Sequence, residues 1–483
     1  MNINSIPYLR NTAVSIKTSS KNNKNLTLSQ TNNNYVTKLS NCNTALYFHP
    51  SFKALNQQST IDALRAQNES ESYNLQKEDS FHSLPQSLAE DFHHQRKHVV
   101  GGGAIVTTDL FDIKGAYNLF HGNDGVLYLF DPSEKVETPE GYNRHETFDD
   151  IQEGSAFIYS PNTCHVEQVE SLSQREGISG VYVEKPMCIN REELARLEKV
   201  VKTPNRNSLY FGDYFYFAQI AALRLMGVPM PYKDSVHIKF DDSENEKFTN
   251  SIENAVPFFK PDEIESIECR FCEQGADDVT ERKWLQERSK GGGVLLDLQI
   301  HVFNLLNLMG LELTSINELK GEKYPYPFNK MHDSSIPPEK RKRGVFVDMR
   351  PGEVEDKVTI KGKINKNIDA NFIVAQYMEN REDTITIKGK NSQKIRITVN
   401  DFDKKVELLD ENDNVIACAG TNIHAYALML HHAQTHFNDP KTKETPMFFD
   451  TQKKSLEQIF EMQEKLYKEA DSSTMQTIQD INQ

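Results

Sequence analysis

Three polar residues in two distant segments of this 483-residue sequence have the types and spacing needed for proton transfer. The first is Lys185, within Glu184-Lys185-Pro186, directly after the apolar run Val181-Tyr182-Val183. Because proline disfavours helical geometry in the residue before it, Lys185 is predicted to lie in an extended turn at the end of a strand. Partial burial would lower the pKa of its amine and allow proton exchange with a substrate hydroxyl near neutral pH. An exposed loop lysine is the alternative interpretation.

The other two residues are Asp297 and His301, in the segment Gly291-Gly292-Gly293-Val294-Leu295-Leu296-Asp297-Leu298-Gln299-Ile300-His301. A spacing of four residues places both on one face of a predicted helix whose other positions are apolar. Two polar side chains on one face of such a segment indicate a polar pocket. A helix N-terminus with a solvated Asp297 and a packed His301 is the alternative.

A glycine turn lies between the first predicted strand, near Val99-Val100, and a helix-like segment. It consists of Gly101-Gly102-Gly103, followed by Ala104 and Ile105. Glycine at such a turn lets the backbone approach a dinucleotide pyrophosphate, and the N-terminus of the next helix adds partial positive charge. Val106 stands where the dinucleotide fingerprint has its third glycine, so a plain turn is the alternative. The turn alone does not decide between the two, and a dinucleotide bound there would contact Gly101, Gly103, Ala104 and Ile105.

Polar residues also end the next two predicted strands. Asp131 follows Gly125–Phe130, where a carboxylate accepts hydrogen bonds from the adenosine ribose and repels a 2′-phosphate. This favours NAD over NADP, although a turn acid before Pro132 is the alternative. Ser160, Asn162 and His165 follow Ala156–Tyr159, at the sheet edge that faces the ligand crevice.

Short apolar runs alternating with helical segments position these residues. The helical spacing is seen in Val166, Val169 and Leu172, and again in Leu194, Leu197, Val200 and Val201. This alternation predicts βαβ units and an α/β fold that begins with a Rossmann-type, doubly wound parallel sheet.

Beyond about residue 208 the pattern predicts an α+β domain with a large, mostly antiparallel open sheet. A helix is expected at Tyr216–Met226, before strands at Ile264–Cys272, Ala370–Tyr377, Thr384–Ile387, Ile395–Val399 and Lys405–Leu409. Their period-two pattern indicates one covered face. Pro325–Gly344 is expected to be a loop. A last helix is expected at Thr451–Lys468, with Asp450 or Thr451 as its N-cap.

These patterns divide the chain into four parts: a poorly ordered extension at 1–95, the Rossmann domain at 96–208, the α+β domain at 209–470 and a flexible tail at 471–483. Residues 1–60 contain no Asp or Glu and six Lys or Arg, and are rich in Asn, Ser and Thr. Such a segment buries too little apolar surface to offset its ordering entropy. An organelle-targeting or secretion signal is the alternative.

Composition excludes several classes of partner. Residues 61–483 carry 49 Lys or Arg and 70 Asp or Glu, a formal charge of −21, which argues against nucleic acid. There is no apolar run long enough for a transmembrane helix. The six cysteines are scattered, which suits a reducing compartment and a cytoplasmic protein, with organelle targeting or specialised secretion through the acid-poor segment as alternatives. Cys269-x-x-Cys272 has no second pair, and no metal-ligand cluster emerges.

The order of these motifs resembles the Gfo/Idh/MocA oxidoreductases (glucose–fructose oxidoreductase, inositol dehydrogenase and relatives), from roughly His98 to Ala470. The carriers of the resemblance are the glycine turn, the strand ending in Asp131, Ser-Pro-Asn-x-x-His, Glu-Lys-Pro and Gly-Gly-x-x-x-x-Asp-x-x-x-His. It implies NAD(P)-dependent oxidation of a secondary alcohol on a sugar, sugar derivative or cyclitol. A non-catalytic dinucleotide- or sugar-binding sensor of the same fold is the alternative.

The resemblance also implies roles for individual residues. Lys185 and His301 would form the acid/base pair, ordered by Asp297. Gly101, Gly103 and Asp131 would hold the dinucleotide, while Ser160, Asn162, His165 and Glu184 would line its nicotinamide side. It further implies a homodimer or homotetramer formed through the open sheet face. For that face, Phe372, Ile385, Ile387, Ile395 and Ile397 supply more apolar side chains than one covered face should need.

Overall fold

The computed structural model describes residues 96–103, 106, 127–133, 136–213, 215, 261–274, 283–323, 325–329, 346–351, 353–378, 381–398, 405–419, 425–440, 445–468 and 475–477. The extension at 1–95 and the helix expected at Tyr216–Met226 lie outside these residues, as do Ala104 and Ile105. None of the helices in the described part of the chain combines the length and the apolar character required to cross a membrane.

The first sheet has six parallel strands in the order β3-β2-β1-β4-β5-β6. These are β1 (Lys97–Val100), β2 (Leu127–Phe130), β3 (Tyr142–Arg144), β4 (Gly154–Ile158), β5 (Ile178–Val183) and β6 (Ser208–Phe211). All four residues of β1 and of β6 are buried, as expected for strands covered on both faces. The predicted Rossmann-type sheet is thus confirmed, and its strand order reverses between β1 and β4, the place where such sheets bind ligands.

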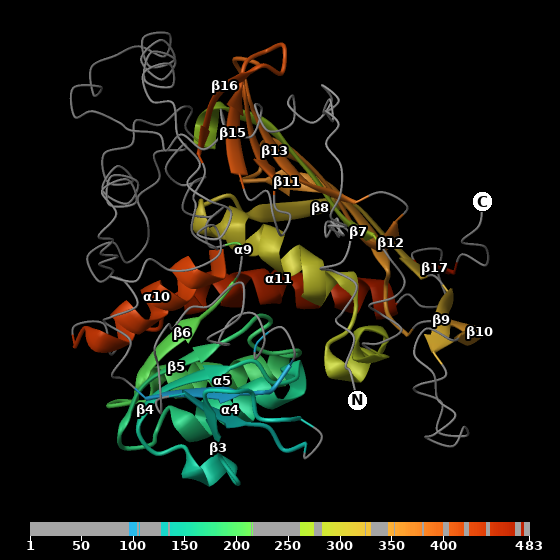
Figure 1. The fold of residues 1–483 in the computed structure, drawn as a ribbon. Helices are drawn as coiled ribbons and strands as arrows, with labels where there is room; N and C mark the ends of the chain where they lie inside the picture. Colours follow the sequence, from blue (N-terminus) through green and yellow to red (C-terminus); the bar gives the residue numbers. More distant parts are fainter. Residues whose placement is uncertain are drawn as a thin grey trace, which may run out of the picture. The chain divides into compact units, whose positions relative to one another are not determined.

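Helices α4 (His165–Leu172), α5 (Arg191–Lys202) and α10 (Ala425–Asn438) pack against this sheet or its helices. Helix α5 begins after Asn190, whose side chain accepts a hydrogen bond from the Glu193 N–H at 2.8 Å. Helix α10 comes from the far end of the chain, and its Phe437 ring lies 6.2 Å from that of Phe157 in β4. A helix from the C-terminal part of the chain therefore packs against the first sheet (Figure 1).

The second sheet has nine strands in the order β16-β15-β14-β13-β7-β12-β11-β8-β17. They are β7 (Ile264–Gln274), β8 (Leu313–Lys323), β11 (Lys357–Ile364), β12 (Ile368–Met378), β13 (Glu382–Gly389), β14 (Lys394–Thr398), β15 (Lys405–Leu409), β16 (Val415–Ala419) and β17 (Met475–Thr477). Its neighbours are antiparallel except for the pairs β7–β12 and β8–β17. The predicted, mostly antiparallel sheet is confirmed.

One face of the second sheet packs against a continuous helical segment and the last long helix. These are a π-helical turn, η10 (Leu295–Gln299), α9 (Ile300–Leu308) and α11 (Phe449–Lys468). The Phe303 ring of α9 contacts Phe372 edge-on, with centroids 5.8 Å apart. Figure 1 shows α9 and α11 running along the sheet.

The five apolar residues expected to exceed the needs of one face are all on the covered face, so that expectation is wrong. Each is at most 2% exposed: Phe372, Ile385, Ile387, Ile395 and Ile397. The register explains this, because Phe372 and Ile385 both pair with Cys269, and Ile397 pairs with Ile385. Ion pairs on the sheet involve partly exposed side chains instead, such as Lys361–Glu318 at 2.8 Å and Lys388–Glu265 at 3.0 Å. Self-association through the open face remains a prediction.

Four boundaries differ from those predicted. Pro325–Asn329 is not a loop but strand β9, paired with β10 (Phe346–Pro351) in a two-stranded sheet. Both strands of such a sheet are edges, where proline is tolerated. Helix α11 begins at Phe449, before either predicted N-cap. Strand β6 carries the first sheet to Phe211, past the predicted boundary at 208, and β17 lies within the segment expected to be a tail.

Short 3₁₀ turns complete the described elements. They are η5 (Phe148–Asp150), η6 (Asn162–Cys164), η7 (Pro261–Glu263), η8 (Lys283–Gln286) and η9 (Arg288–Lys290). The last two precede the glycine segment that leads into η10.

Candidate active site

The polar residues of the first sheet gather at one edge because each follows the carboxyl end of a different parallel strand. Gly101 follows β1, Asp131 follows β2, Ser160 lies just beyond β4 and Lys185 just beyond β5. Asp213 occupies the equivalent place after β6. In an open α/β sheet this edge faces the ligand crevice.

The glycine turn after β1 is fixed by its neighbours on both sides. The Gly101 N–H donates to the Phe130 carbonyl at 2.9 Å, and the Gly102 N–H donates to the Asp131 carboxylate at 2.7 Å. Gly101 has φ +101°, and a Cβ there would lie 2.6 Å from the Ser160 nitrogen. Gly103, in contrast, has no atom of the described residues within 4 Å of the place where a Cβ would be. The turn therefore requires glycine at 101 and leaves space at 103.

Asp131 anchors two turns through its side chain. Its Oδ2 accepts from Gly102, and its Oδ1 accepts from the Ser133 N–H at 2.8 Å. A carboxylate offers about four acceptor positions. Asp131 can therefore hold the glycine turn and still accept a further hydroxyl.

The three polar residues after β4, Ser160, Asn162 and His165, make different contacts. His165 is buried, with Nδ1 2.9 Å from the Pro186 carbonyl oxygen and Nε2 2.8 Å from that of Ser160. The ring thus links the turn after β4 to the turn that carries Lys185, and its polar atoms face the backbone. The Ser160 hydroxyl donates to Gln168, and Asn162 lies near Gly291, where a Cβ would be 3.5 Å from its Nδ2.

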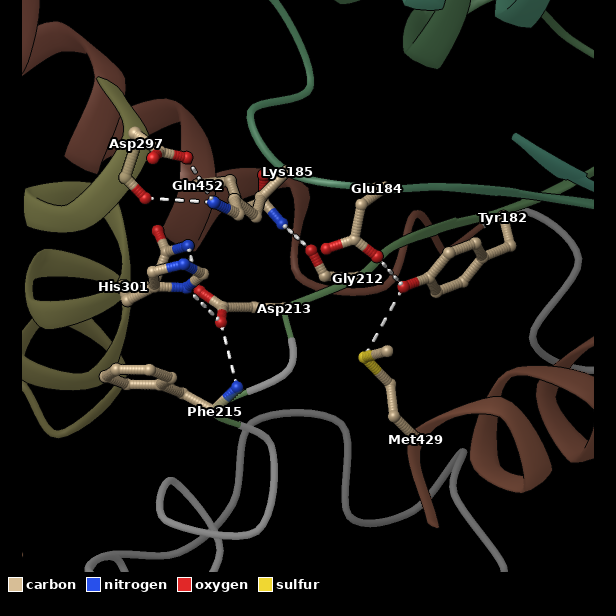
Figure 2. A network of polar contacts seen from close by, with 11 residues as sticks. Tyr182, Glu184, Lys185, Gly212, Asp213, Phe215, Asp297, His301, Met429 and Gln452 are labelled. Atoms are coloured by element: carbon tan, nitrogen blue, oxygen red, sulfur yellow. Dashed lines mark hydrogen bonds and ion pairs between the residues drawn. The ribbon is translucent and has the colours of Figure 1, made fainter. Parts of the chain in front are cut away.

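Lys185 and Asp297 form an ion pair that joins the two predicted motifs (Figure 2). Lys185 Nζ donates to Asp297 Oδ1 at 3.0 Å and to its main-chain oxygen at 2.9 Å. Burial would lower the pKa of Lys185, but Asp297, Glu184 and Asp213 outweigh it and raise the pKa above its usual value. The expectation of a lowered lysine pKa is therefore wrong: Lys185 is held as a cation.

Asp297 is itself held by two features. Its Oδ2 accepts from Gln376 Nε2, in β12, at 3.1 Å. The turn that carries it starts at Gly293, which has φ +100° and lies so close to Glu355 that a Cβ would be 2.6 Å from Oε1. Glu355 Oε1 also accepts from the Leu295 N–H at 3.2 Å, while Tyr467 in α11 donates to its Oε2. Each oxygen of the Asp297 carboxylate thus has a donor.

His301 contacts a different carboxylate, Asp213. Its Nδ1 lies 2.7 Å from Asp213 Oδ1, and both side chains are buried. The Phe215 ring stacks on the imidazole at 4.5 Å between centroids (Figure 2). Burial lowers the pKa of His301, although Asp213 opposes this, so the imidazole is neutral at neutral pH. Asp297 thus contacts Lys185, whereas the carboxylate that contacts His301 is that of Asp213; the ordering role of Asp297 remains a prediction.

Glu184 lies beside this network. Its Oε2 accepts from the Tyr182 hydroxyl at 2.6 Å, and that hydroxyl also lies 3.6 Å from the Met429 sulfur. Burial raises the pKa of Glu184 to about 7, against the opposing effects of Tyr182 and Lys185. Its Oε1 is buried and has no hydrogen-bond partner among the residues that the structure describes. That oxygen therefore keeps unused acceptor capacity.

Sequence reasoning missed Asp213 and Gln376. Asp213 had a readable signal, because it follows the apolar run Leu209-Tyr210-Phe211 and Gly212, as the other site residues follow their strands. Gln376 had none, since its place beside Asp297 depends on the register of β12 in the second sheet.

Comparisons with known proteins bear on the fold. No family model matches the chain, and no curated protein sequence matches it. Among solved structures, Gal80p, a transcriptional regulator from Kluyveromyces lactis, is similar over 77% of this chain and 89% of its own, with 13% identity and a TM-score of 0.51. A levoglucosan dehydrogenase in complex with NADH and L-sorbose is similar over 77% and 97%, with 14% identity and a TM-score of 0.50.

An aldose–aldose oxidoreductase from Caulobacter crescentus, complexed with glycerol, is also similar, over 77% of this chain and 98% of its own, with 16% identity and a TM-score of 0.49. At such identities a structural likeness establishes the fold alone, and here the likeness to Gal80p and to the levoglucosan dehydrogenase does so. This fold agrees with the parallel first sheet and the mostly antiparallel second sheet described above. The chain therefore has the two-domain fold of the Gfo/Idh/MocA oxidoreductases.

Proposed function

We propose that this protein is an NAD-dependent oxidoreductase that interconverts a secondary alcohol and a ketone on a sugar, sugar derivative or cyclitol. The observation that carries the proposal is the Lys185–Asp297 ion pair, which brings a strand-end lysine of the first sheet together with the helical segment of the second domain. The neutral His301 lies in the same network. A cation and a neutral base near the cofactor edge are the groups that alcohol oxidation needs.

The residues at the sheet edge fit a dinucleotide. Gly103 leaves space at the turn, Asp131 keeps acceptor capacity for a ribose, and the buried Glu184 Oε1 has no donor among the described residues. Ser160 and Asn162 lie beyond the next strand at the same edge, where we place the nicotinamide side. A bound nicotinamide would supply the acceptor for the hydride of the carbinol carbon.

The two acid/base residues have different charges and therefore different roles. His301, neutral because burial lowers its pKa, takes the hydroxyl proton as the carbinol C–H bond breaks and the carbonyl forms. Lys185, a cation with a raised pKa, stabilises the negative charge that develops on the oxygen. Asp297 keeps the ammonium in place. In the reverse direction His301 returns the proton.

Asp131 sets the expected cofactor preference. Because its carboxylate would repel a 2′-phosphate, NAD(H) should bind at least about 10-fold more tightly than NADP(H), a difference of about 1.4 kcal/mol. Fluorescence titration with both cofactors measures this. Asp131→Asn should reduce the difference in affinity between NAD(H) and NADP(H) while keeping the contact to Gly102. Equal affinities in the wild type would show that Asp131 does not bind the adenosine ribose.

A second candidate function is a non-catalytic sensor that binds a dinucleotide or sugar. One observation favours it: a similar structure is that of a transcriptional regulator, Gal80p. To separate the two, the protein is incubated with NAD and a panel of aldoses, polyols and cyclitols while the absorbance of reduced nicotinamide is followed. Turnover of any member that Lys185→Ala abolishes supports the enzyme, whereas cofactor binding without turnover supports the sensor.

A further inference from the structure

The His301 imidazole is enclosed so that its orientation is fixed. It is fully buried, with Phe215 stacked on one face at an interplanar angle of 15° and the Phe271 ring edge-on at 6.3 Å. Nδ1 faces Asp213 Oδ1 at 2.7 Å. An ionised carboxylate only accepts hydrogen bonds, so Nδ1 must carry the hydrogen, and in the neutral ring the lone pair is then on Nε2.

Asp213 is held in turn by groups that keep it ionised. Its Oδ2 accepts from Asn304 Nδ2 at 2.7 Å, and its Oδ1 also accepts from the Phe215 N–H at 3.0 Å. Burial would raise the pKa of Asp213, but His301, Asn304 and Phe215 outweigh it and lower the pKa. The preceding Gly212 carbonyl accepts from Gln452 Nε2, in α11, at 2.8 Å (Figure 2).

Asp297 makes its hydrogen bonds elsewhere: its two carboxylate oxygens accept from Lys185 and Gln376, and the oxygen that faces His301 Nδ1 belongs to Asp213. We propose that Asp213 is a positioning residue that holds His301 in the tautomer with Nδ1 protonated and leaves Nε2 to accept a proton. The use of Nε2 in catalysis rests on the oxidation proposed above, whereas the tautomer does not. The ion that forms when His301 is protonated is stabilised by Asp213 at hydrogen-bond distance.

The tautomer can be read directly by NMR. The protein contains 15 histidines, so the ring nitrogens are labelled with ¹⁵N and the His301 signals are identified by their loss in His301→Gln. At neutral pH we expect a protonated Nδ1 and an unprotonated Nε2. A protonated Nε2 in the wild type would overturn the proposal, and this outcome is independent of any substrate.

Two isosteric variants then test which carboxylate acts on His301. The charged groups around the ring are Asp213 after β6, Lys185 after β5 and Asp297 in η10, with Glu184 close to Asp213 and Lys185. Asp213→Asn should lower the protonation constant of His301 about tenfold or more, or abolish its protonation over the range in which the protein is folded. Asp297→Asn removes the same charge without removing a hydrogen bond to the ring and should have a smaller effect.

An equal or larger effect of Asp297→Asn would overturn the assignment to Asp213. In turnover assays, Asp213→Asn should move the acid limb of the oxidation profile in the same direction as the titration, which a purely structural role would not do. If the titrations come out as expected but His301→Gln keeps full turnover, the positioning of the ring by Asp213 stands and the proposed proton transfer fails.

Discussion

Replacing Lys185 or His301 by alanine should lower turnover about 10²–10⁴-fold while changing dinucleotide affinity little. The reason is the geometry of the site: Lys185 is hydrogen-bonded to Asp297 and His301 to Asp213, whereas Asp131 is the residue that holds the glycine turn, through Gly102. Steady-state rates and fluorescence titration of NAD measure the two quantities separately. Asp297→Asn should keep the shape of the site and lose activity, because an amide cannot hold the ammonium as an ion pair.

Matched controls make this result specific. Lys202→Ala removes an exposed lysine that pairs with Glu198 at 3.3 Å on the surface of α5, and it should leave turnover unchanged. His301→Gln keeps more of the buried volume than alanine, so it separates loss of the base from loss of packing. Near wild-type turnover in both the Lys185 and His301 variants would show that the chemistry lies elsewhere.

Substitutions at two glycines of the turn should affect different properties: Gly101→Ala the stability of the protein, and Gly103→Ala its binding of NAD. Gly101→Ala places a Cβ 2.6 Å from the Ser160 nitrogen, at a φ of +101°, and should lower the free energy of unfolding by about 2–4 kcal/mol. The methyl group of Gly103→Ala has no atom of the described part of the chain within 4 Å and should change stability little. Because its added methyl enters the space assigned to the pyrophosphate, Gly103→Ala should instead weaken NAD binding.

Denaturant unfolding and NAD titration of the two variants test this contrast. A Gly101→Ala protein as stable as the wild type would contradict the close approach of the turn to Ser160. Unchanged NAD affinity in a folded Gly103→Ala protein would place the pyrophosphate elsewhere.

Four strands of the first sheet, β1, β2, β4 and β5, could be predicted from the sequence because they are continuous apolar runs that end in polar turns. Asp131, Ser160 and Lys185 could be assigned to one sheet edge on that basis. Strand β6 begins at Ser208, where the predicted first domain ends, so neither this strand nor Asp213 after it was predicted. The alternation of apolar residues also does not determine which residues pair across the strands of the second sheet. For this reason the sequence did not show that the five apolar residues share one covered face, or that Gln376 lies beside Asp297.

The charge state of Lys185 shows a different limit. Burial alone predicted a lowered pKa, and that effect is present, but Asp297 lies 112 residues away in sequence and reverses the net direction. A pattern that identifies each motif separately does not say which carboxylate meets which base. For this site the pairing assigns the cation to Lys185 and the neutral base to His301.

The transfer of deuterium from a carbon-deuterated polyol to NAD tests the central claim most directly. The protein is incubated with NAD and deuterated glucose, sorbitol or myo-inositol, and the nicotinamide is analysed by mass spectrometry, with the Lys185→Ala, His301→Ala double variant as background. Deuterium in the reduced nicotinamide of the wild type, absent from the double variant, is the predicted result. Tight NAD binding with no label transferred from any of the three, and none returned from deuterated NADH to the corresponding ketoses or lactones, would contradict the proposed oxidation and favour the sensor.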